Sequence, residues 1–342
     1  MQHFTFYKKE NHLAFTRTRS GETKLGEKIQ AISNEKRWQD ALKQSSARFV
    51  LIGIPEDIGV RANLGVGGTQ TAWKSFLGSF FNIQHNQFLS GESILLLGEF
   101  DFTELQVKSK NKPLEYLRDI VAEMDKHVAG LIQKVVVCGK IPIVVGGGHN
   151  NAYGNIKGAA LGLQEAGKIK KAQINVINFD AHADFRALEG RHSGNGFSYA
   201  MQEGYLNKYG MLGLHQNYMS QSMLDTIYQN KNIQAHFFED IFVTQKISME
   251  QTMEVLLYFT RNGYTGIEID LDAIENVLSS AISPSGFSTS QARQFIHQSA
   301  VKNKIAYLHI CEGAAELDNG LKSSATGKLI AYLVSDFVKA VG

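Results

Sequence analysis

The 342-residue chain has little of several residue types that mark special classes of protein. Its two cysteines, Cys138 and Cys311, lie far apart in apolar contexts, without a CxxC motif or a histidine-rich neighbourhood. We expect both to be buried, reduced thiols. There are only 4 prolines, and no repeat or tract of biased composition indicates disorder. The composition therefore predicts an ordinary globular protein.

An excess of one charge and long apolar runs are also missing. The 35 Lys and Arg residues nearly balance the 33 Asp and Glu residues, so the sequence offers no basic stripe for nucleic acid and no polybasic patch for anionic lipid. No window approaches the roughly 18 apolar residues of a membrane span, and the first residues, MQHFTFYKKENHLAF, lack the apolar core of a signal peptide. We expect a cytoplasmic protein with neither nucleic-acid nor membrane partners.

Short apolar runs separated by amphipathic segments make up most of the chain. Runs that are nearly continuous in Val, Ile and Leu are typical of strands buried on both faces of a parallel sheet. The predicted strands lie in residues 47–55, 93–100, 141–148, 172–180, 209–217, 234–239, 264–272 and 305–312. Predicted helices lie in residues 113–134, 150–166, 248–262, 288–301 and 326–341.

Strands that alternate with helices predict an α/β fold with three αβα layers, in which helices cover both faces of a mainly parallel sheet of about eight strands. No linker divides the chain, so we predict one domain over residues 1–342. Its core covers residues 46–342, and residues 1–45 form an N-terminal extension with a helix over residues 24–43.

Polar side chains stand where several of these apolar runs stop. His149 follows IPIVVGGG, Asp180 follows INVINF, Asp270 and Asp272 close YTGIEIDLD, and Glu312 closes IAYLHIC. Ligands of open α/β sheets bind beyond the carboxyl ends of the strands. These four strand ends therefore predict one site.

The stretch VINFDAHADFR contains a DxHxD motif formed by Asp180, His182 and Asp184. A carboxylate at the end of a buried strand is costly unless it is paired or binds a metal. Alone, the motif is weak evidence, because phosphoesterases and peptidases use similar spacings.

The other ligand-type residues are also ambiguous one by one. His149 fits a turn histidine, and Asp270 and Asp272 fit helix caps. Together with the DxHxD motif, however, they offer two imidazoles and four carboxylates. This set suits a pair of divalent ions such as Mn²⁺ and is too rich in oxygen for a structural zinc site.

Three motifs, GGGHN (146–150), DAHADFR (180–186) and EIDLDAIE (268–275), resemble the metal-binding signatures of the arginase and agmatinase superfamily, the ureohydrolases, in order and separation. The resemblance extends over about residues 49–341. GIPEDIGVRANLGVGGTQTAW (53–73) resembles the family's first strand and its Gly-rich loop, LGLHQN (212–217) the strand after the second signature, and HICEG (309–313) the last strand. The resemblance implies an arginase/deacetylase-like fold and two Mn²⁺ ions per chain.

The resemblance also implies a role for each residue of these motifs. One Mn²⁺ is expected to bind His149 and Asp184, the other His182 and Asp272, with Asp180 and Asp270 bridging the two ions. Two ions about 3.5–4 Å apart lower the pKa of a shared water towards about 7, which provides hydroxide to attack an amidine or guanidine carbon. Asp184 is expected to relay a proton to the leaving amine. Glu312 stands where the family has a carboxylate that pairs with cationic substrate nitrogens, and a surface Glu is the alternative.

Departures from the family pattern bear on the substrate. Gly148 stands where arginases and agmatinases usually have Asp, and Phe197 where arginases have His. Four features are similar to formimidoylglutamases: these two departures, the GVRAN segment, and Arg186 two residues after the end of the DxHxD motif. Formimidoylglutamate carries two carboxylates, which match an arginine fork, whereas agmatine carries none.

We therefore expect Arg186 to bind a substrate carboxylate. Further candidates for substrate binding are Arg61, Arg191 and Asn195. Solvated surface arginines are an equal alternative for Arg61 and Arg191.

The leading hypothesis is a hydrolase of a linear amidine C–N bond that converts N-formimidoyl-L-glutamate to L-glutamate and formamide, a reaction of histidine degradation. One alternative is an arginase, agmatinase or guanidinobutyrase that releases urea. Another is a non-catalytic member, suggested by Glu268 in place of the family's Ser and by Glu275 and Asn276 in place of its Asp-Pro.

We interpret these departures as changes around the ligands, which can alter metal affinity about 10- to 100-fold. His192 and His215 are likewise expected to lie near the site without binding metal. Assembly into a homo-oligomer, common in this family, stays open because no residue specifies it.

Overall fold

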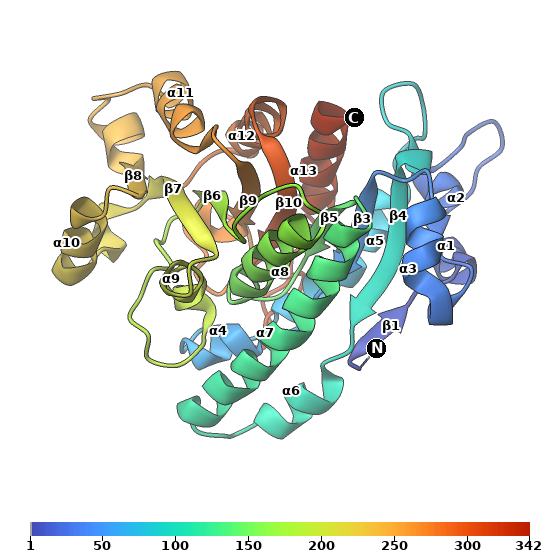
Figure 1. Cartoon of the computed structure of the whole chain (residues 1–342), viewed down its shortest axis with the longest axis horizontal. Helices are drawn as coiled ribbons and strands as arrows, with labels where there is room; N and C mark the ends of the chain where they lie inside the picture. The colour runs from blue at the N-terminus through green and yellow to red at the C-terminus, as the bar shows by residue number, and fades with distance from the viewer. Residues whose placement is uncertain (1) are drawn as a thin grey trace.

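The computed structural model describes residues 2–342, and strands from the whole of this range join one 10-stranded sheet (Figure 1). The order is β1-β4-β3-β5-β10-β9-β6-β7-β8, with β2 also paired to β4. Neighbouring strands are parallel except β1 and β4. The strands are β1 Phe4–Phe6, β2 Gln30–Ala31, β3 Phe49–Gly53, β4 Ile94–Phe100, β5 Ile141–Val145, β6 Ile174–Phe179, β7 Leu206–Leu214, β8 Ile233–Phe237, β9 Tyr264–Asp270 and β10 Lys304–Cys311.

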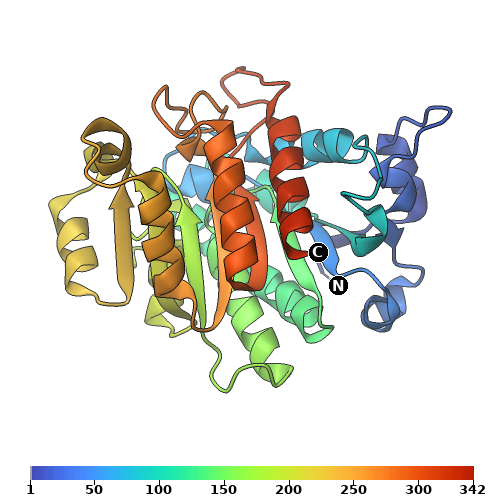
Figure 2. The same ribbon diagram turned by 90° about the horizontal axis from the view of Figure 1, so that it is seen from above.

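Helices cover both faces of this sheet. On one face α7 and α8 pack together against β5, β6 and β10, and on the other α11, α12 and α13 lie side by side, with α5 against α13 (Figure 2). The helices are α1 Lys9–Phe15, α2 Leu25–Lys28, α3 Trp38–Gln44, α4 Ile58–Ala62, α5 Ala72–Phe80, α6 Thr103–Ser109, α7 Leu114–Val137, α8 Asn151–Glu165, α9 Gly196–Gln202, α10 Gln221–Gln229, α11 Met249–Thr260, α12 Thr289–Lys302 and α13 Thr326–Val341. Within residues 2–342, no helix combines the length and apolar character needed to cross a membrane.

The two cores lie on opposite faces of the sheet because side chains alternate along each strand. In β3, Val50 and Ile52 belong to the core under α7 and α8, whereas Phe49 and Leu51 belong to the core under α5 and α13. All five residues of β3 and all six of β6 are buried. This double burial is the reason why the runs read as continuously apolar.

The predicted αβα architecture is confirmed. All eight apolar runs form strands, and all five helices predicted in the core form, with ends that differ from the prediction by at most three residues. The sheet has two more strands than predicted, β1 and β2, both in the N-terminal segment.

The predicted helix over residues 24–43 is wrong. Residues 30–31 instead pair with β4, whose edge would otherwise leave backbone groups unpaired. The Asn34 side chain then accepts hydrogen bonds from the amides of Lys36 and Arg37 and starts a separate turn before α3. The pairing of residues 30–31 with β4 and the cap formed by Asn34 therefore interrupt the predicted helix. Helical periodicity in the sequence reveals neither of them.

The N-terminal segment docks against the end of α5 through the buried His12 and through hydrogen bonds with Asn82. The fully buried His12 ring lies edge-on to Phe81, with ring centroids 5.4 Å apart. The Asn82 side chain accepts a hydrogen bond from the Arg17 amide at 2.7 Å and donates one to the Phe15 carbonyl at 2.8 Å. Burial first, and then the charge of Lys9, lower the pKa of His12 from 6.5 to about 4.

We predict that acid weakens this docking. Because the folded pKa of His12 is depressed, its contribution to stability is complete above about pH 6.5 and is lost as the pH falls towards 4. At pH 5 this loss amounts to about 2 kcal/mol. Urea unfolding with EDTA at pH 7.5 and 5 should show a smaller loss for His12→Phe than for the wild type. The exposed His297→Phe should behave as the wild type, and equal losses in all three proteins would contradict the prediction.

Candidate metal centre

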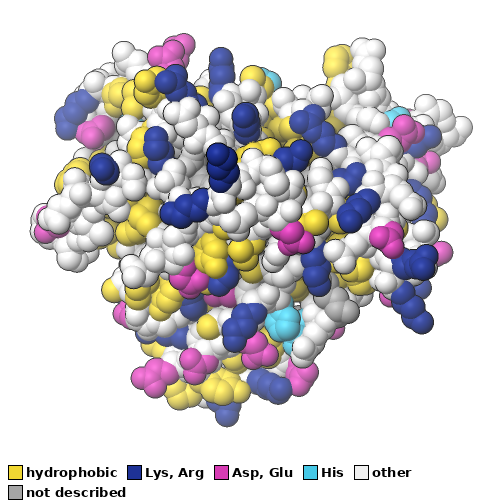
Figure 3. Space-filling view, in the orientation of Figure 1, with side chains coloured by type: hydrophobic (Ala, Val, Ile, Leu, Met, Phe, Trp, Pro, Cys, Tyr) yellow, Lys and Arg dark blue, Asp and Glu magenta, His cyan; other side chains and the backbone are white. Residues whose placement is uncertain are grey.

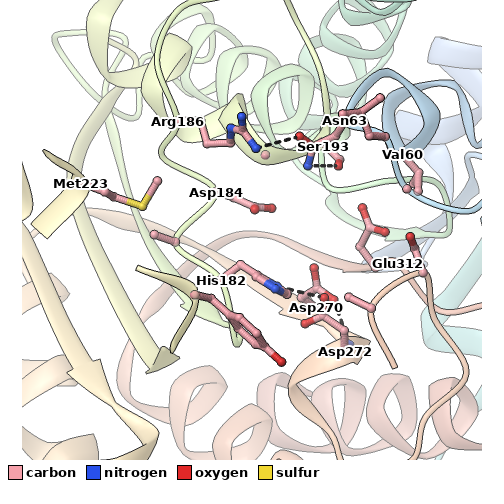
Figure 4. Close-up of a pocket in the computed structure, with 17 residues that line it drawn as sticks. Val60, Asn63, His182, Asp184, Arg186, Ser193, Met223, Asp270, Asp272 and Glu312 are labelled. Carbon is pink, nitrogen blue, oxygen red and sulfur yellow. Dashed lines mark hydrogen bonds and ion pairs between the residues drawn. The ribbon is translucent and has the colours of Figure 1, made fainter. Parts of the chain in front are cut away.

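Four adjacent strands bring the predicted site residues together at their carboxyl ends. The sheet order β5-β10-β9-β6 places β9 and β10 between the strands that precede His149 and Asp180. Asp270 is the last residue of β9, and Glu312 directly follows β10. His182, Asp184, Asp270, Asp272 and Glu312 therefore surround one cavity, although they are up to 130 residues apart in the sequence (Figure 4).

The first cluster of ligand-type atoms surrounds the fully buried His149. Its Nδ1 lies 2.8 Å from Asp184 Oδ2 and 3.2 Å from both Asp180 Oδ2 and Asp270 Oδ2. One imidazole nitrogen and three carboxylate oxygens thus converge on a single point. The structure brings together all four residues expected around the first ion.

The second cluster is more open and shares Asp180 with the first. His182 Nδ1 lies 3.1 Å from Asp272 Oδ2 and 3.7 Å from Asp180 Oδ1, and the His182 side chain is 31% exposed. The two oxygens of Asp180 therefore face two different histidines. This arrangement fits the bridging role expected of Asp180.

Asp270 has a different environment from Asp180. Its Oδ2 faces His149, while its Oδ1 accepts a hydrogen bond from the Asp272 amide at 2.9 Å. The side chain thus also caps the short 3₁₀ turn Leu271–Ala273, which was the alternative interpretation of this residue. Its bridging role stays a prediction.

Two of the site residues have a left-handed backbone. The φ angles are 43° at Asp184 and 62° at Glu312, a conformation that non-glycine residues adopt rarely and at a cost. The Glu312 carboxylate accepts a hydrogen bond from the His149 amide at 2.8 Å. Local strain is thus accepted at positions that aim carboxylates into the cavity.

The burial and crowding of the carboxylates raise the pKa values of three of them. Burial, and then the charge of Asp180, raise the pKa of Asp184 to about 6. Burial and the charges of Asp272 and Asp180 raise the pKa of Asp270 well above its usual range. Burial also raises the pKa of Glu312 to about 8, although the hydrogen bond from the His149 amide opposes the shift.

The donor set fits divalent ions such as manganese. Carboxylate oxygens with a minority of imidazole nitrogens suit hard to borderline cations. His149 Nδ1 and Asp272 Oδ1 are buried atoms without a hydrogen-bond partner in the described part of the chain. Bound cations would satisfy both atoms and relieve the repulsion among the carboxylates.

A buried network lies behind His149. Glu268 Oε2 accepts a hydrogen bond from His309 Nδ1 at 2.6 Å, and Glu268 Oε1 accepts one from the Tyr307 hydroxyl at 2.6 Å. His149 Nε2 faces the same carboxylate at 3.5 Å, which is long for a hydrogen bond. Although burial opposes it, His309 and then His149 lower the pKa of Glu268 to about 2.

The pairing of β9 with β10 builds this network. His309 lies opposite Glu268 in the strand register, and Tyr307 lies opposite Gly266. A Cβ atom at Gly266 would lie 2.4 Å from the Tyr307 ring, so glycine is required for Tyr307 to reach Glu268. The carboxylate of Glu268, fixed by Tyr307 and His309, therefore faces the candidate ligand His149 at 3.5 Å.

The cavity itself has a volume of about 310 Å³ and opens beside Arg186. The Arg186 guanidinium lies 3.3 Å from Glu189 and 3.5 Å from Asn63 Oδ1, and its side chain is 52% exposed. Asn63 in turn donates a hydrogen bond to Ser193 Oγ at 3.3 Å (Figure 4). These three residues form one polar wall opposite the carboxylates.

The other three residues predicted to bind substrate, Arg61, Arg191 and Asn195, do not line this cavity. Arg61 pairs with Asp57 at 2.8 Å and donates to Ser109 at 2.7 Å. Arg191 is 4% exposed, so a solvated surface position is also wrong for it. Its guanidinium pairs with Asp125 and donates to the Asn195 side chain, which holds the loop that carries Arg186. Hydrogen bonds and ion pairs with these partners hold the Arg61 and Arg191 side chains away from the cavity. The sequence does not reveal such partners.

Several lining residues were not predicted. Asn63 belongs to the GVRAN segment given above for the resemblance, and Ser193 lies four residues before Phe197, which was also given there; these were the available signals. Tyr218 stacks on His182 with ring centroids 4.8 Å apart, and no sequence motif pointed to it.

Glu56, which does not line the cavity, fixes the loop before His149. Its buried carboxylate accepts hydrogen bonds from the Gly148 amide at 2.9 Å and from the Asn151 side chain at 2.7 Å.

The departures from the arginase pattern have structural reasons. A Cβ atom at Gly148 would lie 2.6 Å from Asn150 Oδ1, 2.9 Å from Val60 Cγ2 and 3.3 Å from Glu312 Oε1, so an Asp there would have to displace the Asn150 and Val60 side chains. Phe197 packs edge-on to His149, with ring centroids 5.1 Å apart.

The two other histidines expected near the site have different partners. His192 accepts a hydrogen bond from the Gly194 amide, and His215 stacks on Phe238. Within residues 2–342, neither His192 nor His215 joins a cluster of ligand-type residues.

The fold and this site are those of an αβα protein whose candidate metal ligands lie at the carboxyl edge of a mainly parallel sheet. A model described as the arginase family matches residues 47–338. The chain therefore belongs to the arginase family.

Individual relatives agree with this placement. The chain is 29% identical over 293 residues to the formimidoylglutamase of Geobacillus thermodenitrificans, covering 83% of this chain and 81% of the relative. It is 27% identical over 298 residues to the formimidoylglutamase of Streptococcus pyogenes, covering 84% of each.

Solved structures share the fold. The formimidoylglutamase of Bacillus subtilis aligns with a TM-score of 0.72 and 17% identity over 95% of this chain and 94% of that one. The Trypanosoma cruzi formiminoglutamase, whose structure contains Mn²⁺, aligns with a TM-score of 0.70 and 17% identity over 93% and 98%.

We predict that Glu268→Gln weakens Mn²⁺ binding about 10- to 100-fold, because the carboxylate that faces His149 loses its charge. Titration of metal-free protein against a competing chelator measures this affinity. Glu275→Gln is the matched control, since Glu275 is exposed and belongs to neither cluster. An unchanged affinity of the folded Glu268→Gln variant would show that Glu268 does not support His149.

Proposed function

We propose that this arginase-family protein is a manganese-dependent formimidoylglutamase that hydrolyses N-formimidoyl-L-glutamate to L-glutamate and formamide. The observation that carries the proposal is a cavity with metal-type clusters on its floor and Arg186 on the opposite wall. The curated relatives, which are named formimidoylglutamases, support it.

Two Mn²⁺ ions are assigned to the two clusters. His149, Asp180, Asp184 and Asp270 would hold one ion, and Asp180, His182 and Asp272 the other. When bound, such a pair supplies an activated water nucleophile at neutral pH and stabilises charge that develops on the reacting group.

Glu312 and Asp184 have roles toward the substrate itself. The Glu312 carboxyl lines the cavity and is anchored by the His149 amide, so it can hold the formimino nitrogens beside the floor. A cationic amidine next to it favours its ionised form. Asp184 also lines the cavity, and its carboxylate is assigned to carry a proton to the leaving amine nitrogen.

Arg186 is assigned to the substrate carboxylates. A guanidinium binds a carboxylate through two parallel hydrogen bonds, and Asn63 and Ser193 add neutral donors on the same wall. The substrate then spans the cavity, with its carboxylates at this wall and its formimino carbon at the floor. Agmatine, which has no carboxylate, would leave Arg186 without a partner.

A side-by-side assay tests the proposal. Tag-free protein with added Mn²⁺ is offered formimidoylglutamate, arginine and agmatine, and formamide, glutamate and urea are measured. We expect formamide and glutamate from the first substrate only. Release of urea from arginine or agmatine, without formamide, would overturn the substrate assignment. Full Mn²⁺ binding without any turnover would favour a non-catalytic member of the family.

We predict that Arg186→Met raises KM for formimidoylglutamate about 10- to 100-fold, which corresponds to the loss of a charged hydrogen bond worth about 1.5–3 kcal/mol. The effect on kcat should be smaller, because the contact is made equally in the ground state and transition state. Arg261→Met, at an exposed arginine that stacks on Tyr258 away from the cavity, should leave both constants unchanged. An unchanged KM for Arg186→Met would remove Arg186 from the binding site.

A further inference from the structure

A third group of ligand-type side chains lies apart from the candidate metal centre, between β1 and α7. His3 precedes β1, and Glu123 and His127 are four residues apart on α7. Residues at this spacing project from the same side of a helix. The ligand atoms of all three side chains lie within 4.8 Å of one another. Figure 3 shows histidine side chains at the surface over this part of the molecule.

The two histidines contact each other directly. Their rings are edge-on, with centroids 4.9 Å apart, and the His3 ring also lies 5.9 Å from Phe102. The interaction therefore joins the N-terminal segment to the middle of the long helix α7. Figure 1 shows the start of β1 beside α6 and α7.

None of the three side chains has a hydrogen-bond or ion-pair partner among residues 2–342. Burial, and then the neighbouring His3, lower the pKa of His127 below its usual value, so its ring is neutral at neutral pH. A neutral imidazole has the free lone pair that metal binding requires.

We propose that His3, Glu123 and His127 form a structural site for a borderline divalent cation such as Zn²⁺, which links the N-terminal strand to α7. Two imidazoles and one carboxylate are a common protein ligand set for zinc, with water in the fourth position. This set is richer in nitrogen than the catalytic clusters, so it favours Zn²⁺ over Mn²⁺.

The site closes with little movement. Ligand atoms about 2.0–2.1 Å from a tetrahedral Zn²⁺ lie about 3.4 Å from one another. The Glu123 side chain is exposed and both histidines are partly exposed, so side-chain rotation can supply the difference. No part of the core has to move.

The test counts Zn²⁺ per chain in tag-free protein that has been stripped with EDTA and saturated with Mn²⁺. The probe is Zn²⁺ alone, and the variants are His3→Ala, Glu123→Gln and His127→Ala. We expect each variant to bind one Zn²⁺ fewer than the wild type at equal free Zn²⁺. Counting by difference removes any Zn²⁺ that exchanges into the catalytic clusters. His297→Ala, at an exposed histidine of α12, is the matched control and should keep the wild-type count.

Hydrogen exchange of the β1 amides gives a second measurement. Zn²⁺ at about 100 times its dissociation constant should slow local opening of β1 up to about 100-fold in the wild type and in His297→Ala, but not in the three variants. The same zinc count in all five proteins would overturn the proposal. It would also fall if only His3→Ala lost zinc, because His3 would then bind without α7.

Discussion

The main physical constraint on this structure is the mutual repulsion among four carboxylates at one edge of the sheet. Asp180, Asp184, Asp270 and Asp272 lie around two imidazoles, and burial with neighbouring charge raises the pKa of two of them. Such a cluster is stable only if cations or protons balance it. The ligand set therefore favours divalent cations at this edge of the sheet, which is the basis of the metal assignment proposed above.

The sheet order makes this concentration of charge possible. β5, β10, β9 and β6 are neighbours, so parallel strands that come from distant parts of the chain end side by side. Behind the ligands the same pairing places His309 opposite Glu268, and Gly266 leaves space for the Tyr307 ring. As a result, a fully buried network of Glu268, Tyr307 and His309 faces His149. Glu268 is one of the departures from the family pattern, which in the sequence alone also suggested a non-catalytic protein.

On the opposite wall of the cavity, the polar partners of each arginine decide which one is available to a ligand. Arg186 lines the cavity, and its guanidinium has polar contacts only with Asn63, another lining residue, and with the exposed Glu189 among the described residues. Arg191 is drawn inward because Asp125, Asn195 and the Asn150 carbonyl satisfy its guanidinium. One loop thus carries one arginine that is available to a ligand and one that fixes the loop itself.

The sequence by itself determined the layers, the eight core strands and the identity of the candidate metal ligands. Each of these depends on local pattern, because apolar runs mark buried strands and the ligands occupy three short motifs at strand ends. Only the tertiary structure decided which arginines reach the cavity, that residues 30–31 form a strand, and that Glu268, Tyr307 and His309 meet. These outcomes depend on partners distant in sequence, whose distances and orientations exist only once the strands have paired and the helices have packed.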